Sequence, residues 1–207
     1  DSSAPTVKQS FFPVSDAGNP KTSSNIYLDF SEDVIYTGSG AGVNQSLWTM
    51  FEEMEKSTGD AKRQAKNKLA NAIFNSITLR KFSLSGDELP IKENHVVGGE
   101  FGKDVDIDYT QVQLEDNRAK GGGIRVIFPN SGLHLENGGQ YCFLITNLLD
   151  SSRNPFLYDP IDFWSWDEET KKAAMEAGYD VNSFIVDFPA AMLERVGIED
   201  DDRPQKR

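Results

Sequence analysis

The sequence predicts a mainly β protein, in which an antiparallel β-sandwich is interrupted by a pair of helices. Short segments that alternate apolar and polar side chains recur along the chain, separated by turn-forming residues, as is typical of half-buried strands. Between about residues 44 and 76 the apolar period lengthens to three or four residues, which is typical of amphipathic helices. The strands before and after this stretch indicate a sandwich with a helical insertion.

The clearest early strand covers residues 26–30, where Ile26, Leu28 and Phe30 share one face. Further strands are predicted over residues 77–84, 124–128 and 140–146. The last of these is the best candidate for a central strand because it is almost wholly apolar. Residues 105–109 alternate apolar side chains with aspartates and are also predicted to be a strand, and the alternation continues through Val112 and Leu114.

The predicted helical pair begins with an apolar stripe at helical spacing, formed by Leu47, Met50, Phe51 and Met54. Asp60 is placed to cap a second helix. The predicted inner face of that helix carries Ala61, Ala65, Leu69, Ala72 and Ile73. Glutamates on the first helix and lysines on the second favour antiparallel pairing, although exposed ion pairs contribute little.

The chain is expected to divide near residue 156. Residues 1–156 form the sandwich, with the insertion at about 44–76, and residues 157–207 form an appendage. This appendage combines an irregular aromatic strap, a helix over residues 167–177, a strand over 180–188 and a short helix over 190–196. The charged tail over 199–207 is expected to be mobile or a linker.

A series of motifs resembles the bacterial Ig-like domain of S-layer proteins and large modular surface adhesins. DSSAPTV (1–7), PVSDAG (13–18), SNIYLDFSEDV (24–34) and GSG (38–40) follow the order of that family. LHL (133–135), GGQY (138–141) and DSSRNPF (150–156) resemble its closing pattern, with Arg153 where glycine is usual. The resemblance covers roughly residues 1–42 and 77–156. It implies an Ig-like sandwich, an extracellular or cell-surface location and a structural role.

Composition excludes two classes of partner. Lys and Arg number 21 against 33 Asp and Glu, for a net charge of −12, so the basic surface that a nucleic-acid backbone requires is missing. Only 38% of the residues are hydrophobic, and the longest apolar runs, such as residues 142–145, are far shorter than the ~20 residues of a membrane-spanning helix. We therefore expect neither nucleic-acid binding nor membrane insertion.

The sequence carries no recognisable catalytic motif. Its two histidines, His95 and His134, lie beside neither a serine nor a cysteine, and there is no nucleophile elbow. No cofactor is required. Calcium is the one metal considered, because Asp104, Asp106 and Asp108 begin a run that has calcium-loop spacing to Glu115.

Other features of the acidic run weaken the calcium interpretation. Tyr109 occupies the position where a calcium loop needs glycine, so a solvated strand face is favoured. The alternative is a calcium site shared with other acidic loops, such as those of Asp29, Glu32 and Asp33.

Two further features bear on partners. The aromatic cluster Tyr158, Phe163, Trp164 and Trp166 has three interpretations: packing on the sandwich of its own chain, an interface to another subunit or domain, or stacking on a carbohydrate. Asn44 begins an N-x-S sequon in a predicted loop, which makes it a candidate glycosylation site.

These features together predict a non-enzymatic structural module of an extracellular surface assembly, such as an S-layer, filament, sheath or adhesin. It would act through contacts with other protein subunits or neighbouring domains. The first alternative is a carbohydrate-binding or accessory module of a secreted enzyme. The second is an enzyme whose site combines the insertion and the appendage, with His95 or His134 beside a carboxylate.

Overall fold

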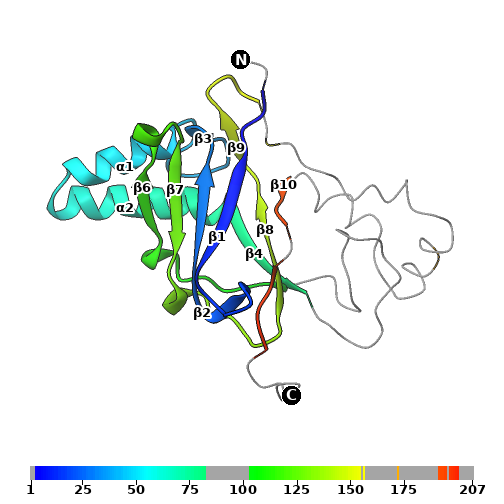
Figure 1. The fold of residues 1–207 in the computed structure, drawn as a ribbon. Coiled ribbons are helices and arrows are strands. Elements are labelled where there is room, and N and C mark those ends of the chain that lie inside the picture. The colour runs from blue at the N-terminus through cyan, green and yellow to red at the C-terminus, as the bar shows by residue number, and fades with distance from the viewer. Residues whose placement is uncertain are drawn as a thin grey trace, which may run out of the picture.

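The computed structural model describes residues 3–82, 103–154, 156, 172, 191–194 and 196–200. The first antiparallel sheet has the order β1 (Val7–Val14), β2 (Pro20–Phe30), β7 (Ile124–Phe128) and β6 (Gln113–Asp116). The second has the order β10 (Ala191–Met192), β8 (Gln140–Ile145), β4 (Ile77–Phe82) and β5 (Lys103–Asp104), and β11 (Val196–Gly197) also pairs with β8. A small sheet pairs β3 (Val34–Tyr36) with β9 (Leu148–Asp150) (Figure 1).

The core lies between the two main sheets. Along β2, Ile26, Leu28 and Phe30 are buried, as their alternation predicts, and β2 pairs with β1 on one side and β7 on the other. The Phe128 ring of β7 lies 5.3 Å from the Phe143 ring of β8, which joins the two sheets. The prediction of a mainly β protein with antiparallel sheets is confirmed.

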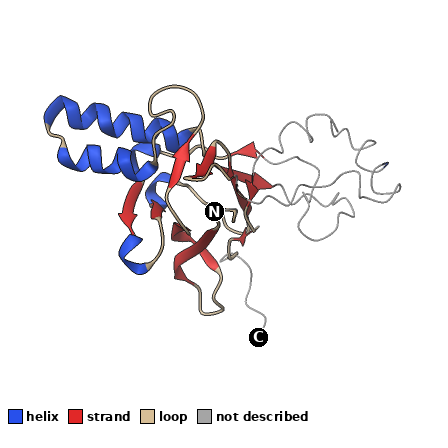
Figure 2. Ribbon diagram, turned by 90° about the horizontal axis from the view of Figure 1, so that it is seen from above, coloured by secondary structure: helices blue, strands red, loops and turns tan. Residues whose placement is uncertain are grey.

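The helical pair is also confirmed, as α1 (Leu47–Lys56) and α2 (Gly59–Phe74). Ser46 caps α1, because its Oγ accepts a hydrogen bond from the Thr49 N–H at 3.0 Å. The Lys68 ammonium of α2 lies 3.1 Å from the Glu53 carboxylate of α1, so opposite charges do face each other across the pair. Both helices lie beside β6 at one side of the first sheet (Figures 1 and 2).

Two details of the second helix differ from the prediction. Its N-cap is Thr58, so Asp60 lies in the first turn, where a negative charge still favours the helix dipole. Ala61 is exposed, and the buried face begins one turn later at Ala65. The reason is that the hairpin projects away from the core, so the start of α2 lies beyond the described elements that bury its later turns (Figure 1).

The predicted strand over residues 105–109 is wrong. Strand β5 ends at Asp104, and a 3₁₀ turn, η1 (Tyr109–Gln111), begins at Tyr109. The Asp108 carboxylate accepts a hydrogen bond from the Thr110 N–H at 3.1 Å, and its own N–H donates to the Gly132 carbonyl at 3.0 Å. Local side-chain bonds of this kind compete with strand pairing, and here they replace it. Two further 3₁₀ turns are η2 (Arg118–Lys120) and η3 (Asn130–Gly132).

The predicted short helix over residues 190–196 is also wrong. Strands β10 and β11 there both pair antiparallel with β8, and Ile198 just beyond them is buried in the core. The edge of β8 needs backbone partners, and this demand overrides the local preference for a helix. The aromatic strap, the predicted helix at 167–177, the predicted strand at 180–188 and residues 201–207 lie outside the described residues, apart from residue 172.

A tight turn follows β9. Buried Asp150 accepts hydrogen bonds from the Asn154 N–H at 2.7 Å and the Asn154 side-chain amide at 2.8 Å. Burial opposes the charged form, yet these hydrogen bonds outweigh it and lower the pKa of Asp150. Arg153 has φ of 65°, the left-handed conformation that glycine adopts at lower cost.

We predict that Arg153→Gly raises the free energy of unfolding by about 1 kcal/mol, because it removes left-handed strain at an exposed side chain. Urea unfolding measures the change. Arg63→Gly is the matched control, because it lies within α2 and should lower stability by about 1 kcal/mol. A loss of stability in both variants would contradict the prediction.

We also predict that Asp150 makes stability fall in acid. A pKa lower in the folded than in the unfolded chain stabilises the fold above the unfolded value of about 3.9, and this contribution is lost as the pH falls through the folded pKa. Asp150→Asn should therefore be less stable at neutral pH and lose less stability than the wild type below about pH 4. Thermal melts across that range test this, and parallel pH curves for the two proteins would refute it.

Candidate functional site: a groove between the helical pair and strand β6

A groove of about 580 Å³ lies between the two helices and the η1–β6 segment. One wall comes from α1 and α2, and the other from η1, β6 and the loop that follows β7. The lining residues are Phe51, Met54, Glu55, Lys62, Lys66, Leu69, Ala70, Ile73, Tyr109, Thr110, Gln111, Val112, Gln113, Leu114, Pro129 and Ser131.

The inner part of the groove is apolar. Leu69 and Ile73 of α2 and Leu114 of β6 are buried and belong to the core that also contains residues of the two main sheets. Phe51 and Met54, on the predicted stripe of α1, are only partly buried. The stripe is thus longer than the core can cover, and its outer end lines the groove instead.

The outer rim of the groove carries charge. Lys62 and Lys66 lie four residues apart on one side of α2, with Glu55 of α1 on the same rim. Neither lysine forms an ion pair with any residue that the structure describes, whereas Arg63 pairs with Asp60 and Lys68 with Glu53. The rim therefore offers two uncompensated ammonium groups in a chain whose net charge is −12.

An aromatic pair lies at the end of α2. The Phe74 side chain is 59% exposed and meets the Tyr109 ring edge to face, with 5.1 Å between the ring centres. The Tyr109 hydroxyl donates to the Ile77 carbonyl at 2.9 Å, which holds this ring in place. The Phe74 ring therefore adds exposed apolar surface next to a residue that lines the groove.

Hydrogen bonds within η1 stiffen the polar wall. The Asp108 carboxylate accepts from the Thr110 hydroxyl at 2.5 Å and the Gln111 amide at 2.7 Å, and both bonds lower the pKa of Asp108. The Ser131 hydroxyl donates to the side-chain oxygen of Gln111. Thr110, Gln111 and Ser131 therefore line the groove in one connected arrangement.

Strand β6 is at the edge of its sheet. It pairs with β7 over Gln113–Asp116, and within the described chain no strand lies on its other side. Alternate backbone N–H and C=O groups of such a strand point away from its partner and remain open to a further strand. The groove and this open edge are adjacent, because Gln113 and Leu114 belong to both.

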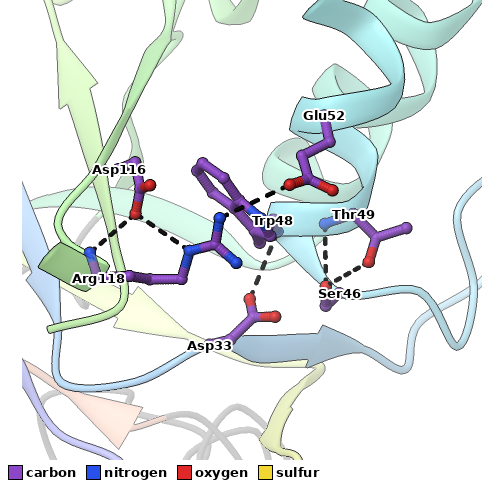
Figure 3. A network of polar contacts seen from close by, with 7 residues as sticks. All are labelled: Asp33, Ser46, Trp48, Thr49, Glu52, Asp116 and Arg118. Carbon is purple, nitrogen blue, oxygen red and sulfur yellow. Dashed lines mark hydrogen bonds and ion pairs between the residues drawn. The ribbon is translucent and has the colours of Figure 1, made fainter. Parts of the chain in front are cut away.

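A polar cluster joins the segment after β6 to α1 (Figure 3). The Arg118 guanidinium lies 3.5 Å from the centre of the Trp48 ring, 3.6 Å from the Glu52 carboxylate and 3.2 Å from the Asp116 carboxylate. The Asp116 carboxylate also accepts from the Arg118 N–H at 2.8 Å, and these bonds lower the pKa of Asp116. The Asp33 carboxylate accepts a hydrogen bond from the backbone N–H of Trp48 at 3.4 Å. The cluster holds α1 against the sheet.

Of the three predicted calcium ligands, the structure describes the side chains of Asp106 and Asp108, and neither belongs to a metal-binding group of described residues. Asp106 is exposed and Asp108 caps η1, while the side chain of Asp104 lies outside the described residues. Asp29 is engaged elsewhere, because Arg125 contacts both its oxygens, at 2.6 and 3.1 Å. Among the described residues no three His, Cys, Asp or Glu side chains form a group that could hold a metal ion.

The other predicted site residues fall in three places. Asn44 is exposed with φ of 65° in the turn before α1, so its loop position is confirmed, and its glycosylation remains a prediction. His134 is exposed and does not line the groove, and His95 lies outside the described residues. Tyr158, Phe163, Trp164 and Trp166 also lie outside them.

Sequence reasoning did not identify the groove. One signal was present, because the stripe of α1 extends to Met54 and α2 ends in Phe74, which together are more apolar surface than a short hairpin can bury. The second wall could not be predicted from the sequence, because η1 and β6 return to the hairpin from more than thirty residues further along the chain.

Comparison with protein-family models, with curated proteins and with solved structures found no match to this chain. None of the helices in the described part of the chain is both long and apolar enough to cross a membrane.

We predict that Arg118→Ala lowers the free energy of unfolding by about 1 kcal/mol, mainly through loss of the contact with the Trp48 ring. The two ion pairs are exposed and should add little. Arg118→Lys should restore less than half of the loss, because an ammonium cannot stack as a planar group. Urea unfolding at low and high salt measures both variants, and a loss that vanishes in high salt would assign the effect to the ion pairs instead.

Proposed function

We propose that this chain is a non-enzymatic interaction module of an extracellular or cell-surface assembly, which binds other protein subunits through the groove between the helices and β6. The observation that carries the proposal is the groove itself, which has an apolar inner part and a charged rim and lies beside the open edge of β6. Apolar centres with polar rims are typical of protein interfaces.

The proposal includes an Ig-like sandwich as the scaffold. With β1, β2, β4, β6, β7, β8 and β10 taken as strands A to G, the two sheets have the orders A-B-E-D and G-F-C, with β5 added beyond C. Those are the strand orders of Ig-like sandwiches, and they support the resemblance found in the motifs. The helical pair then occupies the connection between strands B and C.

The chemistry of the groove favours binding over catalysis. Its described polar lining consists of hydroxyls, amides, two lysines and one glutamate. It includes neither a histidine nor a cysteine, and Ser131 is bonded to an amide oxygen and not to a base. The arrangement can hold a ligand but offers no activated nucleophile.

We predict that filling the groove releases the protein from its assembly. Ala70→Trp places a large ring in the groove, whereas Ala61→Trp, on the exposed start of the same helix, is the matched control. In the source cells, wild-type and A61W proteins should sediment with the surface fraction, and A70W should appear in the soluble fraction. Melting curves of the purified variants establish that both are folded. Equal sedimentation of all three proteins, or a chain found only inside the cells, would contradict the proposal.

The alternative, a carbohydrate-binding module, is favoured by one observation. The exposed Phe74 ring lies beside Tyr109 and the hydroxyl and amide side chains of η1, which is a mixture that sugar sites use. Binding on a glycan array that is lost in Phe74→Ala but retained in Phe12→Ala, another exposed phenylalanine, would favour this alternative.

A further inference from the structure

We propose that the groove takes an extended, acidic segment of a partner protein, which adds to the first sheet as a strand beside β6. This inference rests on the proposed function, because it specifies what the interaction module binds and how. The open edge of β6 would supply the main-chain bonds, and Lys62 and Lys66 would select acidic side chains.

The helical pair lies behind the open edge of β6 and extends beyond it. In Figure 1 both helices lie behind β6 and continue beyond it on the side away from β7, and the view from above in Figure 2 has the same arrangement. A segment laid along the outer edge of β6 would therefore have the helices beneath it. The groove lining agrees, because it combines Gln113 and Leu114 of β6 with Met54 of α1 and Lys66 of α2.

The backbone of β6 can accept one more strand. Its four residues span roughly 13 Å at the usual rise of a strand, which matches a segment of about four to six residues. Three of its four side chains are exposed, and only Leu114 is buried. Within the described chain no strand pairs with this edge, so its outward N–H and C=O groups have no strand partner there.

The side chains of the added strand would alternate between two environments. Those on the same face as Leu114 would meet Phe51, Met54 and Leu69, so apolar residues are expected at every second position. The other positions would face solvent. The groove thus predicts a partner sequence with apolar residues at a period of two.

Charge decides which segments are preferred. The rim presents Lys62 and Lys66 without ion-pair partners in the described chain, against the single acid Glu55. An acidic residue at one end of the segment would pair with these lysines, whereas a basic segment would be repelled. The lining therefore carries two lysines against one acid, in a chain in which acids outnumber basic residues.

Panning a random-peptide display library against the full chain tests the proposal. Enriched peptides should alternate apolar residues and carry acidic ones, and a synthetic copy N-methylated at alternate amides should lose binding because it cannot pair with β6. The K62E/K66E variant should bind the acidic peptide about tenfold more weakly at low salt. The control K8E/K120E changes the net charge equally at exposed sites outside the groove and should bind as the wild type does.

Several outcomes would overturn the inference. The first group concerns the peptides: enrichment of basic peptides, no enriched peptide at all, or equal binding of the N-methylated copy. The second concerns the protein: no effect of K62E/K66E on binding, or self-association of the chain through the groove, as measured by sedimentation. The proposed function fails separately, through the behaviour of A70W in the surface fraction. If A70W is released but N-methylation has no effect, the groove binds a partner by a mode other than strand addition.

Discussion

The contact between Phe128 of β7 and Phe143 of β8 joins the two sheets, and the other elements take their places around it. Strand β7 lies between β2 and β6, and β8 lies between β4 and the β10–β11 segment, so each phenylalanine is on an interior strand. Apolar burial is the largest favourable term in folding, and interior strands bury most of it. Strand β8 accordingly has five consecutive buried residues.

The helical pair extends this core without closing over it. Leu47 and Met50 of α1 and Ile73 of α2 are buried in the same cluster as the sheets, so the near end of the hairpin is fixed. The far end projects past β6, and there the apolar stripe continues without a partner layer. The groove is the direct consequence of a hairpin longer than the sheet edge on which it packs. The contact between Arg118 and Trp48 holds α1, which forms part of one wall of the groove, against the segment that follows β6.

Electrostatics separate this groove from the rest of the surface. Several acids of the described chain are already engaged: Asp29 with Arg125, Asp116 with Arg118, and Asp150 with Asn154. The described acidic groups that have a lowered pKa, Asp108, Asp116 and Asp150, owe it to hydrogen bonds that also hold their turns. At the groove the balance is reversed, because its lining carries two lysines, Lys62 and Lys66, against the single acid Glu55.

Local sequence patterns were sufficient to predict the elements that bury one face and expose the other. The alternation of Ile26, Leu28 and Phe30 predicted β2, and the helical spacing of Leu47 and Met50 predicted α1, because side-chain periodicity follows directly from which face is buried. Tertiary structure decided the rest. Residues 191–197 became strands because β8 required backbone partners, and the run of aspartates after β5 became a capped turn because Asp108 bonds within η1 and to Gly132. The groove depended on the capped turn and on the return of β6 to the hairpin, since its two walls are distant in sequence and meet only through long-range packing.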